Sequence, residues 1–185
     1  MSMESREEQH KQRIQLLIVI FVPIFIASLI RFWDIGLRPL HSDEGVNSFF
    51  LLNLYNNNYY HYDPSNYHGP FLYYIGLIPF YIFGLSDFSF RFMPVLFGIM
   101  VVALLYPLRK RFGKMGLLTT GLFIALSPAN SFFSRDTIHE TYLVFFSLAV
   151  VVSFFLYSET RKSRYILFAA ASLAFIITIK ETYIM

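Results

Sequence analysis

Long apolar runs alternate with short charged segments along the chain, and this pattern predicts membrane-spanning helices. Five runs are rich in Leu, Ile, Val and Phe, lack charged residues and lack the period-two alternation of barrel strands: 14–30, 92–108, 115–134, 141–158 and the shorter 165–179. A helix needs about 17–25 mainly apolar residues to cross a bilayer. We therefore predict an all-α, polytopic membrane bundle of about five transmembrane helices. The first run lacks a small-residue cleavage site, so we interpret it as a retained signal anchor.

A sixth apolar run, residues 71–85, is ambiguous because it mixes glycine and proline with several tyrosines. Tyrosine-rich segments favour the headgroup level of a membrane, and cytoplasmic loops collect Lys and Arg. Three basic clusters lie at 6–13, 109–114 and 161–164. All three can be cytoplasmic only if the sixth run does not cross the bilayer. We expect it to form a juxtamembrane helix at the outer interface.

This arrangement predicts the domain organisation of the chain. Residues 1–13 form a cytoplasmic tail, and residues 33–90 form an extracytoplasmic loop that carries amphipathic helices. Residues 1–185 form the N-terminal part of one transmembrane domain. Because the chain stops one turn after Lys180 and Glu181 with neither cap nor tail, we interpret it as a fragment of a longer protein. The predicted location is the cell membrane, with several passes and a cytoplasmic N-terminus.

Composition agrees with a membrane protein and excludes several other classes. Hydrophobic residues make up 56% of the chain and charged residues only 15%, whereas soluble domains carry about 25% charged residues. The absence of cysteine excludes disulfides and thiolate metal sites. The few basic residues fall in small clusters, so we expect no nucleic-acid binding. The lipid bilayer is the first partner that the sequence predicts.

The first candidate site lies about ten residues after the first apolar run, in the segment His41-Ser42-Asp43-Glu44. Ser42 is a good helix N-cap, and two acids in the first turn lie at the positive end of the helix dipole. Both carboxylates should therefore stay ionised, and either could act as a general base or a metal ligand. The alternative is that both acids only stabilise the start of the helix.

A second cluster lies between the third and fourth spans. Asp136 and Glu140 are four residues apart and would share one face of a helix, while Arg135 and His139 would share the adjacent face. This spacing suits a metal pair or an acid–base pair. The alternative is a polar helix cap with an internal salt bridge.

Two smaller clusters fall on the same predicted side of the membrane. Lys180 and Glu181 end the last span, where a snorkelling boundary pair is the alternative, and His68 precedes Gly-Pro in the outer loop, where it could be merely solvated. Charged groups that converge at membrane ends indicate a site. Carboxylates could deprotonate an acceptor there, while Arg135, His68 and Lys180 could neutralise a leaving phosphate. A phosphate at headgroup depth suits a lipid-linked donor.

Three segments carry a family resemblance: residues 38–45 (RPLHSDEG), 62–74 (YDPSNYHGPFLYY) and 83–94 (FGLSDFSFRFMP). Together with the spans they resemble the GT-C superfamily of polytopic glycosyltransferases. The greatest likeness is to the mostly archaeal, PMT-like family known as flippase-activity-associated protein. The resemblance runs from about residue 14 to the end of the chain.

The resemblance implies a GT-C module that transfers a sugar from a polyprenyl-phosphate-linked donor at the extracytoplasmic face, with inversion. It implies Asp43, with Glu44 beside it, as the catalytic base, and Asp136 as support for that base. A divalent cation, Mg²⁺ or Mn²⁺, is a candidate cofactor with Asp43, Asp136 and Glu140 as candidate ligands. The implied substrate-binding residues are His68, Arg135, His139, Glu140, Lys180 and Glu181. Other membrane proteins of the glycosylation pathway are candidate partners.

Two other functions are consistent with the sequence. One is a non-catalytic membrane protein that assists translocation of lipid-linked oligosaccharides for protein glycosylation. The other is a fragment of a transporter or channel, but transporters carry charges near mid-membrane, whereas the charges here cluster at the ends of the spans. Members of the resembled family have more than five spans, so much of the donor and acceptor sites should lie outside this chain.

Overall fold

The computed structural model describes residues 3–64, 66 and 68–180, and this part of the chain is built from helices. It contains one isolated β-bridge, between His68 and Lys180, and no strand. The helices, with η1 a short 3₁₀ turn, are α1 (Met3–Phe32), α2 (Ser42–Asn57), α3 (Phe71–Phe83), α4 (Asp87–Ala103), η1 (Tyr106–Leu108), α5 (Arg109–Leu126), α6 (Pro128–Phe133), α7 (Glu140–Thr160) and α8 (Ser163–Ile179). The predicted all-α class is confirmed.

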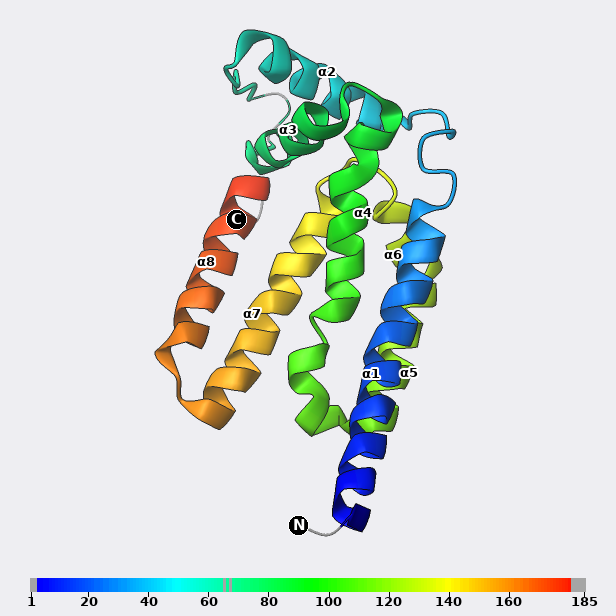
Figure 1. Ribbon diagram of the computed structural model, residues 1–185. Helices are drawn as coiled ribbons and strands as arrows, with labels where there is room; N and C mark the ends of the chain where they lie inside the picture. The colour runs from blue at the N-terminus through cyan, green and yellow to red at the C-terminus, as the bar shows by residue number, and fades with distance from the viewer. Residues whose placement is uncertain (1–2, 65, 67, 181–185) are drawn as a thin grey trace.

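The long helices α1, α4, α5, α7 and α8 run alongside one another, and α2 with α3 covers one end of this bundle (Figure 1). Three segments are long and apolar enough to cross a membrane: Arg13–Phe32, Asp87–Leu126 and Glu140–Thr160. The helices α3 and α8 are apolar but shorter. The protein is therefore a helical membrane bundle, while the number of passes and the side of the N-terminus remain predictions.

Helix α3 forms from the ambiguous run 71–85, and its location at the membrane interface stays a prediction. It lies beside α2 at the end of the bundle far from the N-terminus, and it is inclined to the long helices (Figure 1). Pro70 precedes its first turn, and Gly84 ends it with a φ of 78°, a value that favours glycine. Its buried face packs Leu72, Tyr73 and Phe80 against the rest of the bundle.

The run 115–134 does not form one helix, so that prediction was wrong. Helix α5 stops at Leu126, and Ser127 caps the short α6 by accepting the backbone N–H of Asn130. Pro128 explains the break, because proline lacks an N–H and moves the residue before it out of the helical region. The run 92–108 likewise stops early, at Ala103.

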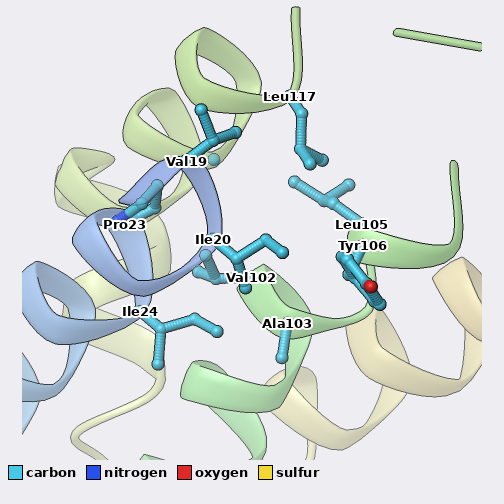
Figure 2. A pocket seen from close by; sticks show the side chains of 10 residues that line it. Val19, Ile20, Pro23, Ile24, Val102, Ala103, Leu105, Tyr106 and Leu117 are labelled. Atoms are coloured by element: carbon cyan, nitrogen blue, oxygen red, sulfur yellow. The ribbon is translucent and has the colours of Figure 1, made fainter. Parts of the chain in front are cut away.

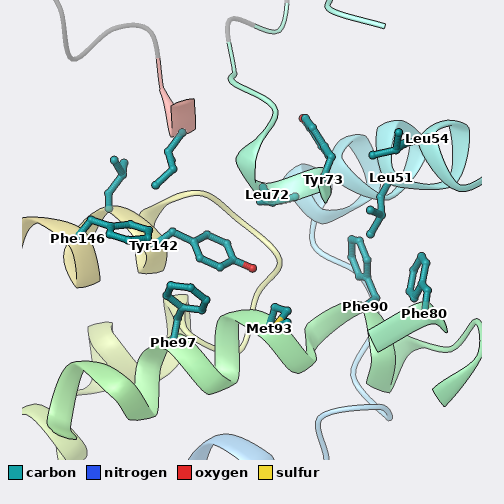
Figure 3. Packing of buried hydrophobic residues seen from close by; sticks show 12 residues of the cluster. Leu51, Leu54, Leu72, Tyr73, Phe80, Phe90, Met93, Phe97, Tyr142 and Phe146 are labelled. Carbon is teal, nitrogen blue, oxygen red and sulfur yellow. The ribbon is translucent and has the colours of Figure 1, made fainter. Parts of the chain in front are cut away.

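An aromatic core joins the helices at the covered end of the bundle. Figure 3 shows side chains from α2, α3, α4 and α7 meeting in one cluster, which also includes Ile179 of α8. Its largest fully buried members are Tyr73 and Tyr142. Burying so much aromatic area fixes α2 and α3 against the bundle, because each such side chain contributes about 1.5–3 kcal/mol.

A smaller apolar cluster closes the other end. Val19 of α1, Leu117 of α5 and Leu105 pack around a void of only about 10 Å³ (Figure 2). A void of this size holds at most one water molecule, and its lining is apolar. We interpret it as a packing contact between α1, α5 and the end of α4.

Candidate active site

The four charged clusters of the sequence meet at the end of the bundle that α2 and α3 cover. Residues far apart in the chain contact one another there in four pairs: Glu44 with Arg91, Arg38 with Asp136, His68 with His139, and Glu140 with Lys180. This convergence supports a shared site at one end.

Arg91 is the centre of this arrangement, and its guanidinium is fully buried. Its Nε and Nη2 donate to the two carboxylate oxygens of Glu44, each at 2.8 Å. The remaining N–H groups donate to the backbone carbonyls of Ile35, Arg38 and Pro39 at 2.8–3.1 Å. All five N–H donors of this arginine are therefore used, and they tie the 35–39 loop and the start of α2 to α4.

Glu44 is a buried, fully hydrogen-bonded anion. Besides Arg91, its oxygens accept the backbone N–H groups of His41 and Thr137, each at 3.0 Å. Burial alone would raise the pKa of Glu44, but the hydrogen bonds from Arg91, His41 and Thr137 hold that pKa below its ordinary value. The side chain of Glu44 is also inaccessible to solvent, so its environment suits a residue that stabilises the fold.

Asp43 has the opposite environment, although it is the neighbouring residue. Its side chain is 73% exposed, and the nearest imidazole nitrogen, Nδ1 of His41, lies 4.0 Å from its carboxylate. The predicted N-cap was wrong by one residue: α2 starts at Ser42, and the cap is His41, whose Nδ1 accepts the N–H of Asp43. Asp43 thus presents a free-standing carboxylate at the positive end of α2.

Asp136 lies inside the protein and contacts the guanidinium of Arg38; only 1% of its side chain is exposed. The same Arg38 also lies 3.8 Å from Glu44 and donates to the carbonyl of Arg135 at 3.1 Å. Asp136 is therefore linked to the first acidic segment through one shared arginine.

The segment 134–139 is not helical, because α7 begins only at Glu140. The expectation that Asp136 and Glu140 share a helical face was therefore wrong. Thr137 helps to hold this segment of turns and bends: its hydroxyl donates to the carbonyl of Phe90 at 2.8 Å, and its own carbonyl accepts Asn47 at 2.8 Å. These contacts with α4 and α2 replace helical hydrogen bonds.

The three candidate metal ligands do not form a joint site. Asp136 contacts Arg38, and Glu140 accepts the Nζ of Lys180 at 2.7 Å, while Asp43 faces solvent. Within residues 3–64, 66 and 68–180, no group of three or more His, Cys, Asp or Glu side chains lies close enough to hold a metal ion. These residues therefore do not fit the divalent cation considered from the sequence.

Two histidines from separate loops stack beside these acids. The rings of His68 and His139 are 4.1 Å apart between centroids and tilted by 8°. Burial lowers the pKa of both, that of His139 well below its ordinary value, and the charge of Lys180 lowers them further. The negative charges of Glu140 and Asp43 partly oppose this effect by raising the pKa of His68. The imidazole of His68 therefore responds to Lys180, Glu140 and Asp43 together. Both shifts favour the neutral form of the imidazole.

This histidine pair predicts a loss of stability in acid. A histidine whose folded pKa is lowered binds its proton more readily in the unfolded state, so its contribution is present above about pH 6.5 and declines below it. Thermal unfolding in detergent between about pH 7.5 and 5.5 should show a falling midpoint, and His139→Gln should flatten that fall. The exposed His10, at the far end of α1, supplies the control: His10→Gln should keep the wild-type slope. Equal slopes in all three proteins would contradict this expectation.

Gly69 allows the loop of His68 to meet the end of α8. Its N–H donates to the carbonyl of Ile179 at 3.1 Å, and His68 pairs with Lys180 in the isolated bridge. A Cβ at position 69 would overlap the backbone carbonyl of Thr178. A glycine here therefore brings His68 and Lys180 together.

Gly69→Ala should consequently displace the loop and lower the free energy of unfolding by about 1–3 kcal/mol, as overpacking typically does. Gly45→Ala is the matched control, because nothing lies within 4 Å of the added Cβ and the site is helical. That control should be neutral or stabilising by up to about 1 kcal/mol. Chemical unfolding in detergent would measure both, and equal stabilities for the two variants would refute the role of Gly69.

Arg135 lies at the edge of this centre, because its backbone carbonyl accepts the guanidinium of Arg38. The guanidinium of Arg135 donates to the carbonyl of Trp33, at the end of α1. The side chain of Arg135 thus contacts the chain just after α1, whereas His68 and Lys180 pair with each other. Glu181 lies outside the described residues.

An open groove follows α7 away from the ion pair of Glu140 and Lys180. It has a volume of about 430 Å³ and, beyond these two charged residues, is lined by Leu143, Val144, Ser147, Leu148 and Val151. Ligand sites typically occupy about 300–1,000 Å³. A groove with charged residues at one end and apolar residues along its length is complementary to an amphiphilic ligand.

Three of the buried charged residues in the described part of the chain, Glu44, Arg91 and Asp136, meet at the covered end of the bundle. A fourth, Arg31, lies beside Gly98, farther along α4. Arg31 lies in the last turn of α1 and donates to the carbonyls of Ala27, Ile124 and Ala125. Charges placed in this way do not mark a path along the bundle, which disfavours the transporter hypothesis.

A comparison with protein families agrees with this geometry. A family model described as dolichyl-phosphate-mannose-protein mannosyltransferase matches residues 67–185. The chain belongs to this family. No curated protein and no solved structure gave a match.

Membership in the mannosyltransferase family confirms the GT-C resemblance and makes the chain an integral membrane protein of a glycosyltransferase family. The greater likeness to the flippase-associated proteins remains a prediction. The matched residues include His68, Asp136 and Lys180, whereas Asp43 and Glu44 precede the match. The first acidic segment is joined to the matched part by Arg91.

The sequence pattern did not single out the two arginines that organise the site. Arg91 is the only charged residue between Phe88 and Ala103 of α4, and a charge in an apolar helix is expected to have a partner. That signal could have identified Arg91 as a site residue. Arg38 carries no such signal, because it lies in a loop and not in an apolar helix.

Proposed function

We propose that this chain contributes the acceptor-activating carboxylate and part of the donor site of a membrane glycosyltransferase that uses a polyprenyl-phosphate-linked sugar at the extracytoplasmic face. The observation that carries this proposal is the contrast between two adjacent acids. Asp43 is exposed at the start of α2, while Glu44 is buried and holds that start in place. The family match supports a lipid-linked sugar as the donor class.

In the proposed reaction, the carboxylate of Asp43 accepts the proton of an acceptor hydroxyl or amine. The oxygen or nitrogen that loses this proton attacks the anomeric carbon of the donor sugar as the bond from that carbon to the phosphate oxygen breaks. The bonding electron pair leaves with the phosphate, and a single displacement inverts the anomeric configuration. A positioned general base of this kind typically contributes about 10²–10⁴-fold to a rate.

Glu44 is poorly suited to the same role, because each of its oxygens already accepts two hydrogen bonds. We assign Glu44 and Asp136 to positioning instead. Both carboxylates interact with Arg38, and Glu44 fixes the helix that carries Asp43. A rigid support is what precise placement of a catalytic group requires.

The donor phosphate is proposed to lie near Lys180 and His68, with its lipid tail along α7. Lys180 pairs with Glu140, but an ammonium has three donors and can keep this contact while it binds a phosphate oxygen. The apolar groove of about 430 Å³ begins at this pair. If the lipid tail occupied the groove, the phosphate of the donor would lie next to Lys180.

The test is transfer of labelled mannose from a synthetic polyprenyl-phosphate donor by membranes that contain the full-length protein. We expect a product of inverted anomeric configuration. A protein that only assists translocation would give no transfer, and its deletion would make lipid-linked sugar accumulate. That pair of results would overturn the proposal.

A further inference from the structure

A second cleft lies at the other end of α2. It has a volume of about 500 Å³ and is lined by residues of the last half of α2 and of the loop that follows, among them Phe49, Asn53, Asn57, Tyr59, His61 and Asp63. At 1.5 Å per helical residue, Asn53 is about 15 Å along the helix from Asp43. This cleft is therefore separate from the candidate active site, although α2 carries both.

The walls of the cleft are held in place by the fold. Phe49, Asn53 and Asn57 are spaced four residues apart and so share one face of α2. The chain reverses at Asn58, which has a φ of 55°. Tyr60 then anchors the loop, because its ring stacks on Tyr73 at 5.1 Å and its hydroxyl donates to the carbonyl of His68 at 3.1 Å. The cleft is thus preformed.

The chemistry of the lining indicates an uncharged ligand rich in hydroxyl groups. Phe49 and Tyr59 expose 61% and 65% of their surface, and an aromatic face attracts the partially positive C–H groups of a sugar ring. The amides of Asn53 and Asn57 each donate and accept, as hydroxyl groups do. None of the described lining residues is Lys or Arg, and Asp63 is an acid, so a phosphate or an anionic lipid headgroup is disfavoured.

We propose that this cleft binds a neutral hexose unit of a glycan on the acceptor. Helix α2 carries Asp43 in its first turn and Asn53 and Asn57 of the cleft farther along, and this helix covers one end of the bundle (Figure 1). A glycan held in the cleft would therefore remain near the site of the proposed transfer. Binding at the cleft does not require catalysis by Asp43, and the inference therefore goes beyond the proposed function.

The first experiment measures binding of α-linked mannobiose to the full chain in lipid nanodiscs, by saturation-transfer NMR. Asn53→Ala and Tyr59→Ala should each weaken binding by about five- to tenfold, the loss expected for one hydrogen bond or one ring contact. Asn56→Ala is the matched control: it is an exposed asparagine of the same helix that does not line the cleft, and it should change the affinity by less than about twofold. Sorbitol, an open-chain polyol without a ring face, should not compete.

A second experiment tests whether the bilayer, rather than a sugar, covers the cleft. The chain has no cysteine, so His61→Cys gives a unique thiol in the cleft lining for a charged, water-soluble maleimide and keeps both asparagines. If the thiol is labelled in nanodiscs and mannobiose slows the labelling, the proposal is supported. An unreactive thiol in this variant, no mannobiose binding, or equal binding by the Tyr59→Ala variant would overturn it. If mannobiose does not bind to the cleft, the proposed sugar transfer is unaffected. If Asp43 is not the catalytic base, mannobiose binding to the cleft is unaffected.

Discussion

Asp43→Asn is expected to lower the rate of sugar transfer by roughly 10²–10⁴-fold, the contribution of a positioned general base. The amide keeps the size of the carboxylate but cannot accept the acceptor proton. Because the side chain of Asp43 is 73% exposed, its replacement should leave the fold intact. Initial rates with a synthetic lipid-phosphate donor would show a lower kcat and little change in the donor KM.

Asp87→Asn is the matched control for this experiment. Asp87 is also exposed and also lies in the first turn of a helix, α4, so its replacement removes the same charge from a similar position. The control should retain nearly full activity. Full activity of Asp43→Asn would refute the assignment of the base, and an equal loss in both variants would point to a general effect of charge.

Arg91→Leu is expected to have the largest effect on stability, a loss of about 3–5 kcal/mol. Removing one partner of a buried ion pair leaves the other charge uncompensated, and that penalty exceeds the worth of the pair itself. Here the carboxylate of Glu44 would lose two hydrogen bonds, and three loop carbonyls would lose their donors. Chemical or thermal unfolding in detergent would measure the loss.

Two comparisons separate this effect from an ordinary loss of charge. Arg111 pairs with Glu159 at 2.6 Å, but both side chains are substantially exposed, so Arg111→Leu should cost less than about 1 kcal/mol. Adding Glu44→Leu to Arg91→Leu should restore part of the lost stability, because the buried charge is then gone. An Arg91→Leu variant as stable as the Arg111→Leu variant would contradict the expected role.

Much of the fold could be predicted from local patterns. The ends of α7 and α8 follow the boundaries of their apolar runs within a few residues, and the run 71–85 forms a short helix of its own, α3. The location of α3 at the outer interface stays a prediction. The break before α6 also had a local signal, Pro128, which the length of the apolar run concealed.

The roles of the acids could not be predicted in this way, since they depend on distant partners. Asp43 and Glu44 share the same local sequence, but Glu44 is buried against distant partners, chiefly Arg91, 47 residues away, while Asp43 stays exposed. The spacing of Asp136 and Glu140 suits a helix, yet Thr137 is held by Phe90 and Glu44 of other helices. Spacing along a chain reports contacts within a helix and carries no information on such tertiary pairing.

The groove on α7 has a consequence for how a lipid substrate would arrive. Val144 and Val151 on its wall remain 48% and 47% exposed, so the groove is open sideways. An isoprenoid chain could slide in from the surrounding leaflet without leaving hydrocarbon, and so avoid a cost of about 0.8 kcal/mol for every methylene brought into water. Product lipid could depart by the same lateral route, and turnover would then be insensitive to the length of the tail.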